Sequence, residues 1–404
     1  MPPALTAIKL TNFRSIANAR VELGPLNVLV GPNGAGKSNL LDAIRFLGDS
    51  VRSDLGPALD ARGGFDNVLF RGHDRPQRIG IEIEAEVTQH SSATARDVYG
   101  LTFILDHTHN SETSFLTREE SFQFKRTARQ GRRITITGGE IEVVDERERK
   151  EPSSRRKELL QDDSLGLATL PRLADEQGGR QVTQIAELFK TFRVVEIDVA
   201  AARGPATVSQ EHILKSDASN LSAFLWQLRE RHPNSYDQLL EDARAFIPGL
   251  EDLRFENVGG GDEHVVLALQ ESWLPGVTKL ADASYGSVRA LALLALLYDP
   301  SPPALTCMEE IDHGLHPYLF DRLVDRLREA STRTQFLLAT HSPALVGRLR
   351  TDELIVCERN PRTGATRAPA VTRAQMDAMA AAVEDRLDLG EMWFSGALGG
   401  VPDS

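Results

Sequence analysis

The segment from Gly31 to Ser38 constrains this chain most, because its sequence, GPNGAGKS, follows the spacing G-x-x-x-x-G-K-[ST]. The apolar run before it predicts a strand, and the run after it carries apolar residues at helical spacing, at Leu40, Leu41, Ile44 and Leu47. A glycine-rich turn between a strand and a helix is the context in which this pattern binds phosphate. A glycine-rich turn that arose by chance is the alternative, and this context disfavours it.

Each residue type in the loop has a physical reason for binding phosphate. The glycines let the backbone curl so that N–H groups face one concavity, and the following helix adds about half a positive charge at its N-terminus. Lys37 supplies a cation to the β- and γ-phosphates, and Ser38 offers a hydroxyl to Mg²⁺. We therefore expect Mg²⁺ and ATP as cofactors, with ATP held by Gly31, Pro32, Asn33, Gly34, Ala35, Gly36, Lys37 and Ser38.

Two adjacent carboxylates, Glu309 and Glu310, follow the apolar run ALTCM at 304–308. Because the carboxyl ends of parallel strands meet at one edge of a sheet, we expect both glutamates to face the crevice of the phosphate loop. Nucleotide hydrolysis uses one carboxylate to hold Mg²⁺ and a second to orient or deprotonate the attacking water. We assign Glu309 to the metal and Glu310 to the water. A solvated acidic turn after a core strand is the alternative.

A histidine, His341, follows the next predicted strand, TQFLLAT at 334–340. Its ring can donate a hydrogen bond to the γ-phosphate or to the attacking water. A lone histidine in such a place is more often structural. Its position after the neighbouring strand favours a catalytic role beside Glu310.

Bulk properties exclude several classes of protein. The 404 residues contain no apolar run of 18 or more, so we expect no membrane span. The two cysteines lie in apolar runs and the N-terminus lacks a secretory signal, which together indicate a reducing, cytoplasmic location. The net charge of −12 argues against nucleic-acid binding over the whole surface, but it leaves a local basic groove open.

We divide the chain into an N-terminal ATPase lobe with the phosphate loop (1–90), a β-rich, charged insertion (91–195), a helical lobe (196–280) and a C-terminal ATPase lobe (281–404). Gly48 is expected to end the helix that Ser38 opens. In the insertion we expect a hairpin with Gly131 in its turn, followed by a strand pair at Gly138-Gly139. No heptad pattern persists long enough to predict a coiled coil.

Together these motifs resemble the RecF/SMC-like ATPases, which have ABC-type heads and are related to the OLD-family ATPase domain. The resemblance covers nearly the whole chain. It implies an α/β fold: an ABC-type P-loop NTPase head with a mixed or parallel sheet core flanked by helices, an antiparallel β subdomain and a helical lobe. It rests on LTNFRSI (10–16), GPNGAGKSN (31–39), SNLSAFL (219–225), ASYGSVRALALLALL (283–297), MEEIDHGLHP (308–317), ATHSPAL (339–345) and LGEMWFSGALGG (389–400).

The resemblance implies that two copies of the chain join around ATP. Ser284, Gly286 and Ser287 match the signature, which in such heads covers the γ-phosphate of ATP bound to the other subunit. Tyr285 replaces the acidic residue that is usual there, and Val288 replaces the usual leucine. We therefore expect a homodimer through ATP-sandwiched heads.

Other matched positions also acquire roles from the resemblance. The stretch 314–317 matches the D-loop, which in such heads also lies at the dimer interface. His341 matches the switch histidine, and Arg14 matches a residue near the nucleotide. Gln77 is a candidate for the Q-loop. SMC-type coiled-coil arms and the OLD-type Toprim nuclease domain have no counterpart, so we expect a head without its own arm or nuclease.

Four functions compete. The first is an ATP-dependent switch for DNA-related work that controls a nuclease or toxin partner, as in an anti-phage module. The second is a RecF-like DNA-repair clamp that binds duplex DNA through the basic run at 125–133, for which a solvated hairpin is the alternative. The third is a scaffold that binds nucleotide without hydrolysing it. The fourth, a transporter ATPase, is disfavoured because the signature is not of the LSGGQ type. We expect no membrane as a partner.

Overall fold

The chain forms two compact units in a computed structural model, which describes residues 4–72, 76–107, 114–126, 129–145, 154–157, 164–172, 178–208, 213–258, 264–382 and 387–399. Unit 1 comprises residues 1–192 and 335–404, and unit 2 comprises residues 193–334. The predicted C-terminal lobe is therefore divided between the units. The reason is that β16 (Gln335–Ala339) pairs in parallel with β3 (Leu26–Val30), near the start of the chain.

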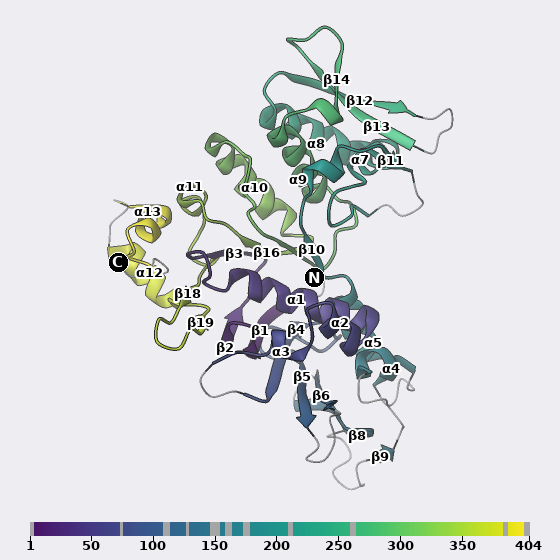
Figure 1. Cartoon of the computed structure of the whole chain (residues 1–404), viewed down its shortest axis with the longest axis vertical. Helices are drawn as coiled ribbons and strands as arrows, with labels where there is room; N and C mark the ends of the chain where they lie inside the picture. The colour runs from purple at the N-terminus through teal and green to yellow at the C-terminus, as the bar shows by residue number, and fades with distance from the viewer. Residues whose placement is uncertain are drawn as a thin grey trace. The chain divides into compact units, whose positions relative to one another are not determined.

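Unit 1 contains an antiparallel sheet of eight strands among the described residues, in the order β2-β1-β4-β5-β6-β7-β8-β9 (Figure 1). Alternation along the strands decides which face is buried, since successive side chains point to opposite faces. In β4, Ile79, Ile81 and Ile83 are buried, whereas Glu82 and Glu84 lie on the opposite face. The strands are β1 (Ala4–Phe13), β2 (Ile16–Glu22), β4 (Arg78–Glu86), β5 (Asp97–His107), β6 (Ser114–Arg126), β7 (Arg129–Thr137), β8 (Glu140–Asp145) and β9 (Ser154–Lys157).

The predicted turn at Gly138-Gly139 is confirmed, because β7 ends at Thr137 and β8 begins at Glu140. The predicted turn at Gly131 is wrong. β6 ends at Arg126 and β7 begins at Arg129, so Gly131 lies inside β7. β7 already pairs with β6 at Arg129 and Gln130, before Gly131 is reached. The register of this pairing, rather than the backbone preference of glycine, therefore keeps Gly131 out of the turn.

A parallel group of strands in unit 1 positions the phosphate loop. β3 pairs in parallel with β16 on one side and with β17 (Leu354–Val356) on the other. All five residues of β3 are buried, as expected for an apolar strand flanked by parallel neighbours. The carboxyl ends of the three strands therefore point the same way.

The helix that follows the phosphate loop is α1 (Lys37–Ser53), and its predicted buried positions are confirmed at Leu40, Leu41, Ile44 and Leu47. The prediction that Gly48 ends this helix is wrong, because Gly48 lies in its interior. Ser50 and Val51 are also buried, so the face that α1 buries continues past the glycine. That burial outweighs the roughly 1 kcal/mol that an interior glycine costs a helix.

The other elements of unit 1 surround these strands. Phe46 of α1 stacks against Phe103 of β5 at a ring-centroid distance of 5.5 Å, which joins the helix to the antiparallel sheet. The remaining helices and strands are α2 (Leu55–Asp60), α3 (Phe65–Val68), α4 (Gly166–Thr169), α5 (Gly179–Lys190), α11 (Pro343–Val346), β18 (Glu358–Arg359), β19 (Thr366–Arg367), α12 (Arg373–Ala382) and α13 (Leu389–Phe394).

Unit 2 packs helices against a small antiparallel sheet. α7 (Leu221–Arg231) contacts β13 (His264–Glu271), and α8 (Pro233–Phe246) contacts β12 (Leu250–Asn257), as Figure 1 shows. Helix α9 (Tyr285–Leu297) packs against both helices, and every residue from Val288 to Leu297 is buried. The other elements are β10 (Arg193–Val195), α6 (Val199–Ala202), β11 (Ala206–Thr207), β14 (Val277–Lys279), β15 (Leu305–Met308) and α10 (Phe320–Ala330).

Within unit 2, β10 and β15 pair in parallel. β15 is the strand that was predicted to end in the two glutamates, and its four residues are all buried. In the parts of the chain that the structure describes, every helix is too short or too polar to cross a bilayer.

Candidate nucleotide-binding site

The phosphate loop has the backbone that its glycines predict. Gly31 follows the end of β3, and Gly31, Gly34 and Gly36 have φ values of 151°, 77° and 99°. These values favour glycine over residues with a Cβ atom. Gly36 is also the N-cap of α1, and it has no side chain that could cap the amides of the first turn. The loop therefore leads the chain directly into the N-terminus of a 17-residue helix, which is the local structure of an anion site.

Lys37 lies inside this loop. Its Nζ donates to the carbonyl oxygen of Gly31 at 2.8 Å and to that of Pro32 at 3.1 Å. The residue is only 6% exposed. A buried ammonium group that is held by neutral carbonyls can gain a stronger, charge-assisted partner from a phosphate. The cation therefore stands where the sequence predicts it.

His341 lies at the same edge of the parallel strands as the phosphate loop. Ala339 of β16 pairs with Leu29 of β3, and Thr340 N donates to Leu29 O at 3.1 Å. His341 follows directly and is exposed. The parallel pairing thus brings His341 and Gly31 to adjacent strand ends, although they are separated by about three hundred residues of sequence.

Residues 357–366, in the C-terminal part of unit 1, pack against the phosphate loop. Cys357 N donates to Val30 O at 2.7 Å, and a Cβ atom on Gly31 would overlap the carbonyl oxygen of Cys357. Arg359 Nη1 donates to Gly34 O at 3.2 Å. A Cβ atom on Gly36 would overlap the Oγ1 atom of Thr366. Glycine is therefore required at 31 and 36 by contact as well as by backbone angle.

A cleft of about 490 Å³ in unit 1 is lined by four arginines, Arg14, Arg62, Arg71 and Arg359, together with Ser15 and Asn39 from either side of the phosphate loop. Arg14 Nε pairs with Asp42 of α1 at 2.6 Å, and Arg62 Nε pairs with the same carboxylate at 3.0 Å. Arg62 Nη2 also pairs with Asp49 at 2.9 Å. Two aspartates against four guanidinium groups leave positive charge in the cleft. The cleft is therefore suited to an anionic ligand.

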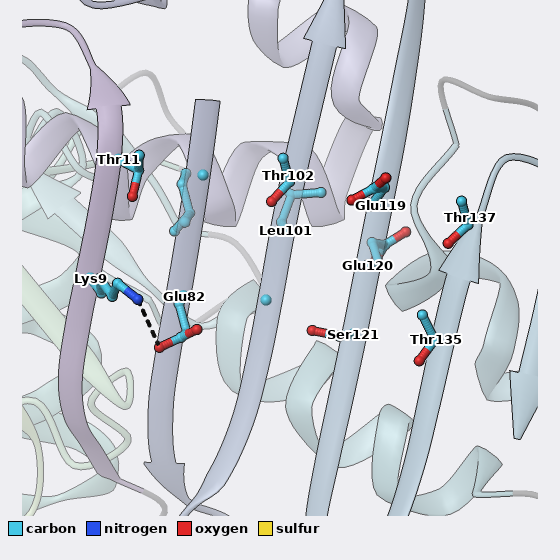
Figure 2. A pocket seen from close by; sticks show the side chains of 13 residues that line it. Lys9, Thr11, Glu82, Leu101, Thr102, Glu119, Glu120, Ser121, Thr135 and Thr137 are labelled. Atoms are coloured by element: carbon cyan, nitrogen blue, oxygen red, sulfur yellow. Dashed lines mark ion pairs between the residues drawn. The ribbon is translucent and has the colours of Figure 1, made fainter. Parts of the chain in front are cut away.

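Figure 2 shows a second cavity of unit 1, about 280 Å³ in volume, on the face of the antiparallel sheet opposite the buried isoleucines of β4. Lys9 pairs there with Glu82 at 4.0 Å. The other labelled side chains include the carboxylate Glu119 and the hydroxyls of Thr102 and Thr135. Since its lysine is paired with a carboxylate and Glu119 adds negative charge, this cavity is a poor match for phosphate compared with the arginine-lined cleft.

Unit 2 carries the remaining predicted residues. Glu309 and Glu310 follow β15 directly, and both are exposed. Ser284 is the N-cap of α9, where its Oγ accepts from Ser287 N at 3.1 Å and lies 2.8 Å from Ser287 Oγ. Gly286 lies in the first turn of that helix. The signature residues therefore stand at the N-terminus of a 13-residue helix.

The structure thus brings the predicted residues together in two sets. Unit 1 holds the loop residues 31–38 with His341 and Arg14, and unit 2 holds Glu309 and Glu310 with the signature residues. Gln77, the candidate for the Q-loop, precedes β4 and is exposed. That these sets act as one catalytic site stays a prediction.

Comparison with known proteins agrees with this geometry. The chain matches the family model AAA_21, described as "AAA domain, putative AbiEii toxin, Type IV TA system", over residues 26–164 and 209–347, which is more than half of its length. The chain belongs to this AAA family. Within it, the chain is a RecF/SMC-like ABC-type ATPase head, so both the family resemblance and the predicted fold class are confirmed.

Individual relatives support the same family. The "DNA replication and repair protein RecF" of Renibacterium salmoninarum is 35% identical over 112 residues, which cover 24% of this chain and 27% of that protein. RecF of Paenarthrobacter aurescens is 34% identical over 287 residues, which cover 64% of this chain and 61% of that protein. The chain therefore matches less than two thirds of the length of these curated relatives.

A solved structure supports the fold. The Smc head domain with an extended coiled coil, bound to the C-terminal domain of ScpA and derived from Pyrococcus furiosus, superposes with a TM-score of 0.54 at 11% identity. The superposition covers 95% of this chain and all of that one. At this identity the match concerns the fold alone.

The residues of this AAA family member fit ATP and Mg²⁺. A buried lysine held by loop carbonyls fits a triphosphate, and the arginine-lined cleft beside it fits further anionic or polar parts of a nucleotide. Mg²⁺ in nucleotide sites is bound by one or two protein oxygens together with phosphates and water. The Ser38 hydroxyl and the Glu309 carboxylate are donors of that kind.

Sequence reasoning missed several residues around the loop. Arg62 and Arg71 lie in a polar segment with no periodic signal, and Arg359 lies in a short strand far along the chain. Thr366 was missed because it too lies in a short strand, β19, far along the chain from the loop. Only the charge of the arginines could have drawn attention to them, and charge alone does not say where a side chain lies.

Proposed function

We propose that this chain binds Mg²⁺-ATP and hydrolyses it to ADP and phosphate. The observation that carries the proposal is the buried Lys37 inside a glycine loop at the end of β3, with His341 at the end of the adjacent parallel strand. Burial of a charged ammonium group is unfavourable, so Lys37 contributes little to the stability of the fold. Its position is explained if it binds a triphosphate.

Each residue then has a role. The loop amides and Lys37 hold the β- and γ-phosphates. Ser38 and Glu309 hold Mg²⁺, which neutralises charge on the phosphates when it is bound. Glu310 orients the attacking water and accepts its proton, and His341 donates a hydrogen bond to the γ-phosphate. Arg14 in the arginine-lined cleft assists nucleotide binding.

The proposal extends to a homodimer in which ATP lies between two heads. Ser284 and Ser287 are at the N-terminus of α9, where helix geometry favours an anion. The signature of one copy would contact the γ-phosphate held by the other copy. This arrangement makes ATP binding a switch between separate and paired heads.

We propose that the switch controls DNA-related work in the cytoplasm through a partner protein, a nuclease or toxin. The supporting observations are the name of the RecF relatives, "DNA replication and repair protein", and the family description, which includes a toxin.

The test is phosphate release by the purified chain with Mg²⁺-ATP, with and without duplex DNA. Lys37→Ala is expected to weaken ATP affinity by about 10- to 100-fold, because it removes a charge-assisted contact. Glu310→Gln is expected to abolish turnover while ATP still binds and heads still pair. Glu256→Gln, an exposed glutamate of β12, is the matched control.

Dimer formation is measured by light scattering after size-exclusion chromatography. If Glu310→Gln hydrolyses ATP like the wild type, the catalytic assignment is wrong. If it does not accumulate an ATP-dependent dimer, the paired-head proposal is wrong. Magnesium-dependent ATP binding without any turnover by the wild type would favour the nucleotide-dependent scaffold instead.

A RecF-like clamp remains the second candidate, because Arg133 and Lys125 share one face of the antiparallel sheet. Arg133 pairs with Gln123 in register, and Lys125 lies two residues along β6. Arg132 points elsewhere, since its Nη1 donates to Gln181 of α5 at 3.2 Å. Residues 127–128 lie outside the described residues.

The clamp is tested by duplex binding at several salt concentrations. Lys125→Ala combined with Arg133→Ala is expected to reduce the slope of log affinity against log salt by about two if both residues contact phosphates. An unchanged slope would remove the support for the clamp. Arg78→Ala, on β4 of the same sheet, is the control for a change in surface charge alone.

A further inference from the structure

Glu310 adopts a backbone conformation that is unfavourable for a glutamate. Its φ is +49°, in the left-handed region. A residue with a Cβ atom persists there only when the surrounding contacts determine its conformation. Two donors hold its carbonyl oxygen: His313 N at 3.0 Å and Arg289 Nη2 at 2.5 Å. Such strain is typical of functional positions, so its location at the proposed catalytic glutamate is informative.

The Glu310 side chain is also held. His313 Nδ1 lies 2.7 Å from Glu310 Oε2, a distance at which the ring nitrogen donates and the carboxylate accepts. Both side chains are more than half exposed, so the hydrogen bond fixes the direction of Glu310 where little packing does so.

The His313 ring is placed by the start of helix α9. The ring centroids of Tyr285 and His313 are 5.5 Å apart. Gly314 has a φ of +76°, and a Cβ atom on it would lie 2.8 Å from the Tyr285 ring. A Cβ atom on Gly286 would lie 2.8 Å from Gly314 O. The first turn of α9 and the loop after Glu310 are therefore in direct contact, and two glycines permit the close approach.

We propose that His313 is a positioning residue for the Glu310 carboxylate and that the Tyr285 ring sets the position of His313. The proposal rests on the proposed ATP hydrolysis. It assigns a purpose to Tyr285, which departs from the acidic residue usual at that place. The contact from Tyr285 through His313 to Glu310 links the signature position to the residue that activates water, all within unit 2.

The link has a mechanistic consequence. Ser284 and Ser287 flank the turn that carries Tyr285. When this turn contacts the γ-phosphate of ATP bound to the other copy, the contact would fix the position of Tyr285. Tyr285 would in turn fix His313, and His313 would fix Glu310. Closure of one ATP site would in this way promote the alignment of Glu310 for the other.

The experiment compares steady-state ATP hydrolysis by variants of the full chain. His313→Leu removes the donor, and we expect kcat to fall about tenfold while KM and ATP-dependent dimerisation stay unchanged, as for a contact that acts mainly on the transition state. His313→Asn places an amide donor near the position of Nδ1, and we expect it to restore much of kcat. His264→Asn, an exposed histidine of β13, is the matched control.

A second pair of variants tests the aromatic contact. Tyr285→Ala is expected to lower kcat in the same way as His313→Leu, and Tyr285→Phe, which keeps the ring, is expected to retain more activity. Circular dichroism and the melting temperature of each variant show whether unit 2 is still folded. Because Asn keeps the donor without the ring of His313 and Phe keeps the ring of Tyr285 without the hydroxyl, a general packing defect would not reproduce the expected order.

Three results overturn the inference. His313→Leu could match the wild type in kcat, His313→Asn could be as impaired as His313→Leu, or the loss could appear in KM and melting temperature instead of kcat. An inactive wild type would instead refute the proposed hydrolysis itself, because the comparison would then have no turnover to measure. The two failures are therefore distinguishable.

Discussion

Replacement of Gly36 by alanine should destabilise unit 1 more than replacement of Gly34, although both lie in the phosphate loop. Both residues have positive φ values, 99° and 77°. Their surroundings differ. A Cβ atom on Gly36 would overlap Thr366 Oγ1 and lie 2.9 Å from Ser15 Oγ, whereas a Cβ atom on Gly34 would meet nothing within 4 Å.

The magnitude follows from these contacts. A left-handed conformation costs an alanine about 1–2 kcal/mol, and this part is common to both variants. At Gly36 the alanine must also displace Thr366, which is 2% exposed and forms a 2.7 Å hydrogen bond with Ser15. Losing that bond and moving the threonine off its rotamer adds roughly 1.5–2.5 kcal/mol. We expect Gly36→Ala to cost about 3–4 kcal/mol in all and Gly34→Ala about 1–2 kcal/mol.

Urea denaturation can measure the difference. Trp393 lies in unit 1 and is 8% exposed. Its fluorescence reports on that unit when Trp226 and Trp273 of unit 2 are replaced by phenylalanine. Adding Thr366→Ala to Gly36→Ala should recover part of the lost stability, because it removes the atom that clashes.

Equal destabilisation by Gly36→Ala and Gly34→Ala would refute this reasoning. So would a double variant in which the effects of Gly36→Ala and Thr366→Ala simply add, because the two residues are in contact and should therefore couple.

Three further predictions concern other parts of the chain. Burial raises the pKa of the Cys357 thiol to about 12, so an alkylating reagent at pH 8 should modify it only after unfolding, as a mass spectrum of the labelled chain would show. Asp242→Ala should destabilise unit 2 by about 2–3 kcal/mol in urea, because the buried carboxylate accepts from Tyr298 and from two arginines of α10; an unchanged midpoint would contradict this. Asp388→Ala removes a capping box with Glu391 and should cost about 1 kcal/mol, seen as faster amide exchange in α13 but not in α9.

Some features of the site could be predicted because they depend on neighbours in the sequence. The curl of the phosphate loop needs only glycines at 31, 34 and 36, and the start of α1 at Lys37 needs only the apolar spacing that follows. The edge position of His341 needed one further rule, that parallel strands align their carboxyl ends.

Other features depend on which segments meet, and no local pattern states this. The cleft joins Arg359 of the C-terminal region to Arg14 and Arg62 from the first part of the chain. Gly48 resembled a helix end and Gly131 resembled a turn, but burial kept the first in α1 and strand register kept the second in β7. In each case packing or strand pairing outweighed a local preference of about 1 kcal/mol.

The sequence alone therefore determined the phosphate-binding motif, the strand that ends in two glutamates and the family to which the chain belongs. The tertiary structure decided which side chains surround them: Thr366 and Arg359 against the loop, and His313 with Tyr285 at Glu310. The physical reason is the distance along the sequence over which each effect acts. Backbone preferences act over a few residues, whereas a side chain's partners depend on how strands and helices pack after the chain has crossed and returned.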